Sequence, residues 1–164
     1  MAHYSEKGWL PILQAQEELL RFASFDNEDA FAIGLKIAEL AKNMYKKSAA
    51  IRICIDDAIV FAYKIPGTDL ENDWWMDRKR NVSRMTGVSS LRACVEAANG
   101  LINTDWMQRE KSFALCGGCM PVFMQKGQTF AYIMVSGMHH QEDHQIIADA
   151  LAGYLGISIG SVCE

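Results

Sequence analysis

Apolar positions that recur every three to four residues predict the main helices of this chain. The clearest series runs from Ala30 to Met44, behind the pair Asp26-Asn27, which is typical of a helix N-cap. Gly87 and Asn99-Gly100 mark two further helix ends, because glycine accepts the backbone conformation that follows a last helical turn. The other expected helices cover Gly8–Gln16, Leu70–Met85, a short stretch from Ser89 or Ser90 to Asn99, Trp106–Glu110, and a last stretch from Gln141 to Tyr154.

Runs of β-branched and aromatic residues predict five strands between these helices. Ala49–Ile55 and Ala58–Tyr63 flank the pair Asp56-Asp57, a pattern typical of a hairpin with a tight turn. The remaining runs are Leu19–Ser24, Cys119–Gln125 and Thr129–Ser136. Because hairpins outnumber candidate parallel crossovers, the order predicts an α+β fold with a five-stranded, mainly antiparallel sheet and helices packed on it.

Length and composition predict one cytoplasmic domain. Its 164 residues, half of them apolar, are enough for a single core, with residues 1–16 as a leading helix and 156–164 as a C-terminal tail. A formal net charge of −4 argues against binding to nucleic acid or to an anionic membrane. No apolar run approaches the roughly 20 residues that span a bilayer. The first residues do not resemble a secretory signal, and the odd number of cysteines favours reduced thiols.

The helix Leu70–Met85 has an unusual density of aromatic and charged residues. Trp75, Val82 and Met85 share one face, which is expected to pack on the sheet. Acidic residues near its start and basic residues further along follow the helix dipole, so an amphipathic helix with a solvated charged side is the favoured interpretation. The alternative is an aromatic and cationic wall for an anionic planar ligand or a partner subunit, formed by Trp74, Arg78 and Lys79.

A lone CxxC motif lies at Cys116-Gly117-Gly118-Cys119. A thioredoxin-type site needs its first cysteine at a helix N-terminus, but a predicted strand follows here. A zinc site needs two further ligands at suitable spacing, and no second CxxC occurs. The motif therefore indicates a bend at which the chain enters the strand. The amides of Gly117 and Gly118 are still candidates to contact a ligand oxygen, because glycine allows close approach.

Three histidines cluster at the start of the last predicted helix. His140 and His144 are four residues apart, so they can share a helix face, but the string HHQEDH does not match the HExxH metalloprotease motif. The positions of His139 and His140 are also those expected of surface residues at an exposed helix start, where no ligand is needed. His144 is the best candidate in the chain for an iron or tetrapyrrole ligand.

Five segments together resemble the GlcG/HbpS-like family, also described as the heme-degrading-domain family. They are FDNEDAFAIGL, AIRICID, PGTDLENDWWMDRKRNVSRMTGVSS, FALCGGCMPV and VSGMHHQEDHQIIADAL, and the resemblance extends from about Glu17 to Leu155. Its most specific parts are N-D-x-W-x-x-R-K from Asn72 to Lys79, the pair Ser89-Ser90, Gly117-Gly118 with Pro121, and Ser136-Gly137 followed by Glu142-Asp143-His144.

The resemblance implies an α/β sandwich similar to profilin-like and PAS-like sheets, homo-oligomers built on dimers, and heme or a related tetrapyrrole as a candidate cofactor. The family usually has His-Gly-Gly where this chain has Cys116-Gly117-Gly118, so a thiol stands here in place of an imidazole. The candidate ligand-binding residues, from the patterns and the resemblance together, are Trp74, Arg78, Lys79, Ser89, Ser90, Gly117, Gly118 and His144, with His144 also the candidate metal ligand.

Three functions stay open at this point. The first is a homo-oligomeric protein that binds a tetrapyrrole or another small anionic ligand. The second is an assembly module without a cofactor, which the near-apolar tail LAGYLGISIGSVC favours. The third is a thiol-dependent enzyme that uses Cys116 and Cys119. The absence of GxSxG, Walker and Rossmann patterns argues against a standard hydrolase, kinase or dehydrogenase.

Overall fold

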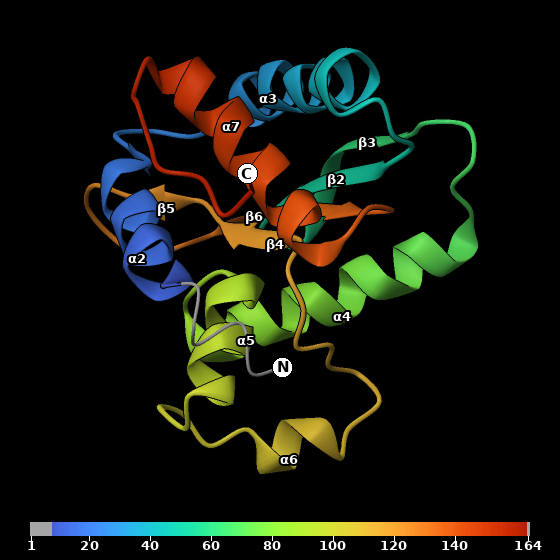
Figure 1. Cartoon of the computed structure of the whole chain (residues 1–164). Helices are drawn as coiled ribbons and strands as arrows, with labels where there is room; N and C mark the ends of the chain where they lie inside the picture. The colour runs from blue at the N-terminus through green and yellow to red at the C-terminus, as the bar shows by residue number, and fades with distance from the viewer. Residues whose placement is uncertain (1–7, 164) are drawn as a thin grey trace.

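A four-stranded antiparallel sheet lies at the centre of the computed structural model, which describes residues 8–163 (Figure 1). Its strand order is β3-β2-β6-β4, with β3 at one edge. A separate pair, β1 and β5, runs parallel. The strands are β1 (Arg21–Phe22), β2 (Ala50–Ile55), β3 (Ala58–Lys64), β4 (Cys119–Pro121), β5 (Phe123–Met124) and β6 (Ala131–Ser136). The predicted α+β fold is therefore confirmed.

The expected single sheet of five strands is divided into these two parts. The first helix, α2 (Trp9–Leu19), extends three residues beyond its predicted end, so only Arg21–Phe22 is left to form a strand. The predicted strand Cys119–Gln125 breaks at Val122, whose amide still donates to Ala131 O, and β5 then pairs with β1. A parallel pair cannot be joined by a hairpin, which agrees with the long separation of β1 and β5 in the chain.

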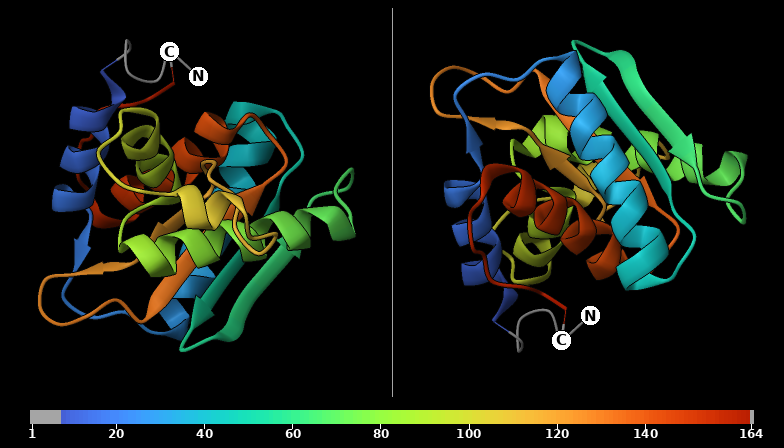
Figure 2. Two further views of the ribbon diagram at one scale, coloured as in Figure 1. Left: turned by 90° about the horizontal axis from the view of Figure 1, so that it is seen from below. Right: turned by 90° about the horizontal axis from the view of Figure 1, so that it is seen from above.

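Helices cover both faces of the sheet (Figures 1 and 2). On one side lie α3 and α7, and on the other lies α4. The exposed Asp26 is the N-cap of α3, and its carboxylate accepts the amides of Glu28 and Asp29. The helices after α2 are α3 (Asn27–Leu40), which continues as the π-helical turn η1 (Ala41–Tyr45), α4 (Leu70–Thr86), α5 (Ser90–Ala98), α6 (Asp105–Gln108) and α7 (His140–Leu155).

Strand β2 shows why both faces are buried. Ile51 and Ile53 belong to the main core beneath α3 and α7. Ala50 and Cys54 point to the other face, where Met76 of α4 covers them. Because successive side chains of a strand alternate between faces, a run of apolar residues such as β2 requires a covering layer on each side.

The buried face of α4 differs from the predicted one. Met76, Lys79 and Val82 are buried, whereas Met85 is 57% exposed and Trp75 is only half-buried. A helix turns about 100° per residue, so positions 76, 79 and 83 form a stripe that faces the sheet. The prediction failed because it assigned Lys79 to the solvent, and Lys79 in fact lies at the centre of the buried stripe.

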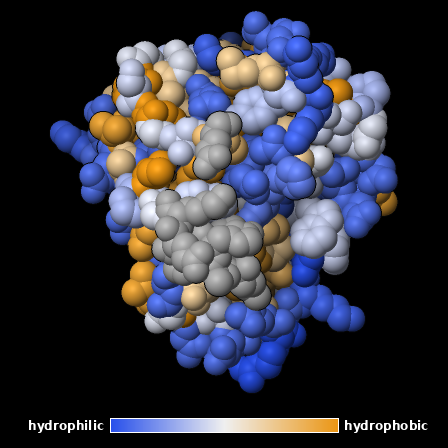
Figure 3. Space-filling model, in the orientation of Figure 1, coloured by the Kyte–Doolittle hydropathy of each residue, from blue (hydrophilic) through white to orange (hydrophobic). Residues whose placement is uncertain are grey.

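The C-terminal tail is covered within the chain. After Gly156, which ends α7 with φ 69°, the chain returns toward α2, where Gln16 donates to Gly160 O over 2.7 Å. Val162 is 5% exposed and packs with Trp9 and Leu13. Figure 3 still shows apolar atoms at the surface over α2 and the tail. The tail therefore gives only weak support to an assembly module. Residues 1–7 of the expected leading segment, and Glu164, lie outside the described residues.

The described helices have no membrane-crossing candidate. Within residues 8–163, none combines the length and the apolar character that a bilayer span requires.

Candidate ligand-binding site

A cavity of about 420 Å³ lies where α4, the loop before β4, the end of β6 and the start of α7 meet. In Figure 1 this is the region where the beginning of α7 approaches α4. Its lining is mostly polar and comes from all four segments: Asp69, Glu71, Asn72, Trp75, Lys79, Cys116, Ser136, Gly137, Met138, His140 and Asp143. Segments separated by up to about 70 positions in the sequence thus contribute to one site.

A buried ion pair forms one wall of the cavity. Lys79 Nζ lies 3.1 Å from Asp143 Oδ2 and donates to Val135 O over 3.0 Å. The other oxygen of Asp143 accepts the amide of Met138 over 3.0 Å. Burial raises the pKa of Asp143 to about 6, and the neighbouring Lys79 opposes that shift. The two charges therefore compensate each other in a site from which water is largely excluded.

Gly117 and Gly118 allow the loop to approach its neighbours closely. A Cβ atom at Gly117 would lie 2.3 Å from His140 O, and one at Gly118 would lie 2.4 Å from Val135 O and 2.6 Å from Lys79 Nζ. Gly118 also has φ +130°, a conformation that other residues rarely adopt. The predicted bend is confirmed. Neither glycine lines the cavity itself, but together they set its position against α7 and β6.

His140 is held in its neutral form at the cavity. Its Nδ1 accepts the amide of Gly117 over 3.0 Å, which assigns the ring proton to Nε2. Burial lowers the pKa of His140 to about 4, and the Lys79 charge adds to the effect. The sequence interpretation of His140 as part of an exposed helix start is wrong, because the loop at Gly117 covers its ring.

The two CxxC thiols have different surroundings, and neither is activated. Cys116 lines the cavity, and burial raises its pKa although Lys79 acts in the opposite direction. Cys119 is fully buried in β4, where burial raises the pKa of its thiol to about 12. A nucleophilic thiolate needs a lowered pKa, so the structure gives no support to thiol-dependent catalysis at this motif.

Ser89 and Ser90 lie behind the site. Ser89 is the N-cap of α5, and its hydroxyl accepts the amide of Arg92 over 3.1 Å. Ser90 Oγ accepts the amide of Cys119 over 3.0 Å and thereby anchors the start of β4. Both side chains are buried and absent from the cavity lining, so their contacts position the backbone.

The wall of Trp74, Arg78 and Lys79, which was the alternative interpretation of this helix, does not form, because Lys79 points inward while the other two face outward. The Arg78 guanidinium lies 4.0 Å from the centre of the Trp74 ring. It also donates to Lys111 O over 2.6 Å and to Phe113 O over 2.9 Å. Trp75, which packs edge-on against Trp74 at 5.2 Å, supplies the aromatic side of the cavity instead.

His144 lies in the contact between α7 and α2, away from the cavity. It is 1% exposed, and its Nε2 lies 2.8 Å from Gln16 Oε1. Burial lowers its pKa to about 3. Its Nδ1 is buried and has no hydrogen-bond partner among the described residues. A heme iron could reach either ring nitrogen of His144 only by opening the core, because the side chain is buried.

Sequence reasoning missed several lining residues as members of a site. Asn72 donates from Nδ2 to Ser136 Oγ over 3.1 Å and so connects α4 with the end of β6. Asp143 is absent from the candidate residues predicted from the sequence, yet it is 2% exposed and paired with Lys79. A signal was present, because Asn72, Ser136 and Asp143 all belong to the motifs that carried the family resemblance.

The charge balance of the cavity opposes the small anionic ligand that the sequence suggested. Three carboxyl groups line it, those of Asp69, Glu71 and Asp143, against the single ammonium group of Lys79. Because Lys79 is already paired with Asp143, the remaining carboxylates leave a negative potential at the opening. Such a potential favours ligand groups that are neutral or cationic.

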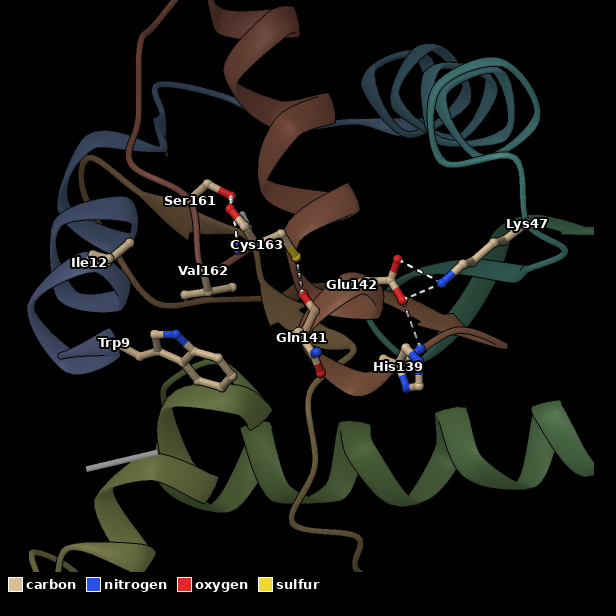
Figure 4. A pocket seen from close by; sticks show the side chains of 9 residues that line it. All are labelled: Trp9, Ile12, Lys47, His139, Gln141, Glu142, Ser161, Val162 and Cys163. Atoms are coloured by element: carbon tan, nitrogen blue, oxygen red, sulfur yellow. Dashed lines mark hydrogen bonds and ion pairs between the residues drawn. The ribbon is translucent and has the colours of Figure 1, made fainter. Parts of the chain in front are cut away.

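A second cavity, of about 540 Å³, lies on the other side of the first turn of α7 (Figure 4). Trp9 of α2 and Val162 of the tail form its apolar part, and an ion pair between Lys47 and Glu142 closes another side. The Cys163 thiol faces Gln141 O at 3.6 Å. Its charged pair is partly exposed, and it contains none of the eight candidate ligand-binding residues.

The chain is similar in sequence and in fold to known proteins. The family model "Haem degrading protein HbpS-like" matches residues 25–152. A UPF0303 protein of Yersinia pseudotuberculosis serotype O:3 (strain YPIII) is 30% identical over 155 residues, which cover 93% of this chain and 90% of the relative. The crystal structure of the Ybr137w protein has a TM-score of 0.77 at 24% identity, with 90% of this chain and 87% of that chain covered. The PduOC:heme complex has a TM-score of 0.63 at 14% identity, with 84% and 98% covered.

The two solved structures, at 24% and 14% identity, have the same fold as this chain. The region matched by the family model extends from α3 into α7 and includes every residue that lines the 420 Å³ cavity. The chain belongs to the haem-degrading HbpS-like family.

Proposed function

We propose that this protein binds a small molecule in the 420 Å³ cavity. The observation that carries the proposal is the Lys79–Asp143 pair, in which two charged side chains are only 4% and 3% exposed at the wall of an open cavity. Buried ion pairs contribute little net stability compared with well-packed apolar residues, so their presence at a cavity favours a role in recognition. The volume falls in the range of about 300–1,000 Å³ that is typical of small-molecule sites.

Heme or a related tetrapyrrole is the first ligand to consider, because of the family and because PduOC was crystallised with heme. The residues fit this group in part. Cys116 provides a sulfur donor, His140 a neutral imidazole, and Trp75 an aromatic side. A bound heme would supply redox-active iron, and Cys116 and His140 would be the residues to hold it. The carboxylates of Asp69 and Glu71 at the opening would repel heme propionates, and this is the main misfit between heme and the site.

Titration of the purified protein with hemin tests the tetrapyrrole proposal. We expect micromolar hemin to shift the Soret band. Cys116→Ala or His140→Ala should weaken the affinity for hemin at least tenfold. Matched controls are Cys163→Ala and His139→Ala, which change the same residue types in the second cavity. The variant His144→Ala tests the ligand that the sequence suggested. If hemin produces no Soret shift with the unmodified protein, heme is not the ligand.

A second candidate function is self-association, and β3 favours it. The strand is an unpaired edge of the sheet and carries Ile59 and Tyr63, which are 58% and 40% exposed. Phe31 and Leu35 of α3 lie on the same side of the molecule and are 55% and 51% exposed. An edge strand with apolar side chains is a template for pairing with another chain. A second copy is the proposed occupant, because an antiparallel arrangement of two β3 strands brings the acidic Asp56-Asp57 end of one toward the Lys64 end of the other.

We also propose that the protein is located in the cytoplasm. All five cysteines are free thiols, including two that share the CxxC motif, and such thiols are typical of a reducing compartment. Mass spectrometry of the protein isolated under alkylating conditions checks this, since a native disulfide would argue for an oxidising one.

A further inference from the structure

A smaller cavity, of about 280 Å³, adjoins the proposed ligand site. It lies between α4 and the segment that contains α6, and it shares two lining residues, Trp75 and Cys116, with the 420 Å³ cavity. These two side chains therefore separate the cavities. No other residue lines both of them within the described part of the chain.

The two cavities differ in chemistry. The larger one is lined by carboxyl, amide, hydroxyl and ammonium groups. The smaller one, called the apolar cavity below, has more apolar side chains, those of Met107, Phe113, Ala114, Leu115 and Trp75, although Arg78 and Gln108 also line it. A site with one polar compartment and one richer in apolar side chains fits a ligand that has the same division.

The outer wall of the apolar cavity is attached to α4 by a few polar contacts. Arg78 donates to Lys111 O and Phe113 O, and Asn81 Nδ2 donates to Ser112 O over 2.8 Å. The amide of Ala114 donates to Arg78 O over 3.3 Å. Trp106 packs edge-on against Phe113 at 5.3 Å. These contacts give Arg78 a clear role, which is to hold the wall in place.

From this arrangement we infer that the two cavities form one divided site, with Trp75 and Cys116 as its partition, and that the ligand is amphiphilic. Its apolar end is a flat ring that occupies the smaller cavity against Trp75. Its polar end is a hydrogen-bond donor, neutral or cationic, that faces Ser136, Asp69 and Glu71 in the larger cavity. This inference rests on the proposed function and specifies the chemistry of its ligand.

Three small probes separate the requirements for a ring and for a donor. Benzamidine has a flat ring and a cationic donor group, benzoate has the ring with an anionic group, and acetamidine has the donor group without the ring. Binding is followed by the shift of the Trp75 indole N–H signal in nuclear magnetic resonance spectra, assigned with Trp75→Phe. We expect benzamidine to bind at least tenfold more tightly than either benzoate or acetamidine.

Variants that fill the apolar cavity test the division itself. Ala114→Leu and, independently, Leu115→Phe add bulk there, and thermal unfolding verifies that each variant is folded. Both should reduce benzamidine binding at least tenfold and leave acetamidine binding within twofold. Glu71→Gln, in the polar cavity, should weaken both amidines by a similar factor, because it removes a charge that faces their common group.

The outcomes distinguish this inference from the proposed function. If the amphiphilic probe binds no better than the other two, or if both cavity-filling variants leave its affinity unchanged, the divided site is wrong. If hemin binds at Cys116 in that case, the proposed function survives without it. If neither hemin nor any probe shifts the Trp75 signal, the ligand-binding function itself is overturned.

Discussion

At the residue scale, burial determines what the charged and titratable side chains of the site can do. Lys79 and Asp143 are nearly inaccessible, so each depends on the other for compensation. The adjacent pair Lys47–Glu142 joins the same turn of α7, yet its lysine side chain is 42% exposed. Water can replace a lost partner in the second pair but not in the first.

This difference predicts the effect of removing each lysine. Lys79→Met should lower the free energy of unfolding by about 3 kcal/mol, because it leaves the Asp143 carboxyl group buried and uncompensated. Lys47→Met should change it by less than about 1 kcal/mol, as for other exposed ion pairs. Urea denaturation of both variants measures the two values. Equal effects would show that the Lys79 pair is as solvated as the Lys47 pair.

A second prediction concerns acid stability and His144. Its folded pKa of about 3 lies below the ordinary 6.5, so the unfolded chain takes up a proton first as the pH falls. The stability that His144 contributes is therefore fully present above pH 6.5 and should fall by about 2 kcal/mol at pH 5. Asp143, whose folded pKa is raised to about 6, acts in the opposite direction between about pH 6 and its ordinary 3.8.

The variant His144→Gln isolates the histidine term from that of Asp143. Glutamine can still donate to Gln16 Oε1 but does not titrate, so its stability should decline less between pH 7 and pH 5 than that of the unmodified protein. Urea denaturation at pH 7, 6 and 5 provides the comparison. Parallel pH profiles for the two proteins would contradict a buried, neutral His144.

At the element scale, the loop before β4 connects the helices to the sheet. Its two glycines bring the backbone against His140 O and Val135 O, closer than any side chain permits. Ser90 and Arg78 hold the two ends of this loop by hydrogen bonds to Cys119 N and Phe113 O. The position of Cys116 in the cavity follows from these contacts.

Alanine substitutions of glycines in two loops test this role. Gly118→Ala should lower the free energy of unfolding by about 3 kcal/mol, through a strained positive φ together with a clash against Val135 O and Lys79. Gly127→Ala also has a positive φ, +90°, but meets no atom within 4 Å, so it should cost only about 1 kcal/mol. Thermal and urea unfolding measure both. A Gly118→Ala variant as stable as Gly127→Ala would mean that the loop can move away.

At the scale of the whole molecule, β3 and α3 lie side by side (Figure 2), and together they expose the apolar side chains of Phe31, Leu35, Ile59 and Tyr63. The ring of Phe61 sits on Gly34 of α3, and Phe31 contacts it edge-on at 6.4 Å. The pairing between β2 and β3 is interrupted next to Cys54, which gives the edge strand a bulge. A bulge limits, but does not prevent, addition of a further strand.

Light scattering on purified protein tests self-association through this edge. We expect a mass of at least two chains, and Ile59→Lys should reduce it toward one chain because lysine on an edge strand opposes pairing. The matched control is Leu101→Lys, which places the same charge at a residue that is 60% exposed, outside the β3 and α3 surface. A single-chain mass for the unmodified protein would exclude the assembly.

Much of the fold could be predicted from local patterns, whereas little of the site could. The α3 helix and the β2–β3 hairpin have strong local signals, an N-cap at Asp26 and a turn at Asp56-Asp57, and both occur as expected. The failed wall at Trp74 and Arg78 has a physical cause. A charged residue such as Lys79 is usually exposed, and only its partner Asp143, 64 residues away, makes its burial tolerable.

The sequence by itself determined most of the elements, the α+β class and the family, because periodicity, caps and motifs are local properties of the chain. Only the tertiary structure decided which polar residues are removed from water. It paired Lys79 with Asp143, turned His144 toward Gln16, stacked Arg78 on Trp74 and placed Trp75 between two cavities. The reason is that burial and pairing depend on contacts between distant segments, and no local pattern contains the free energy of those contacts.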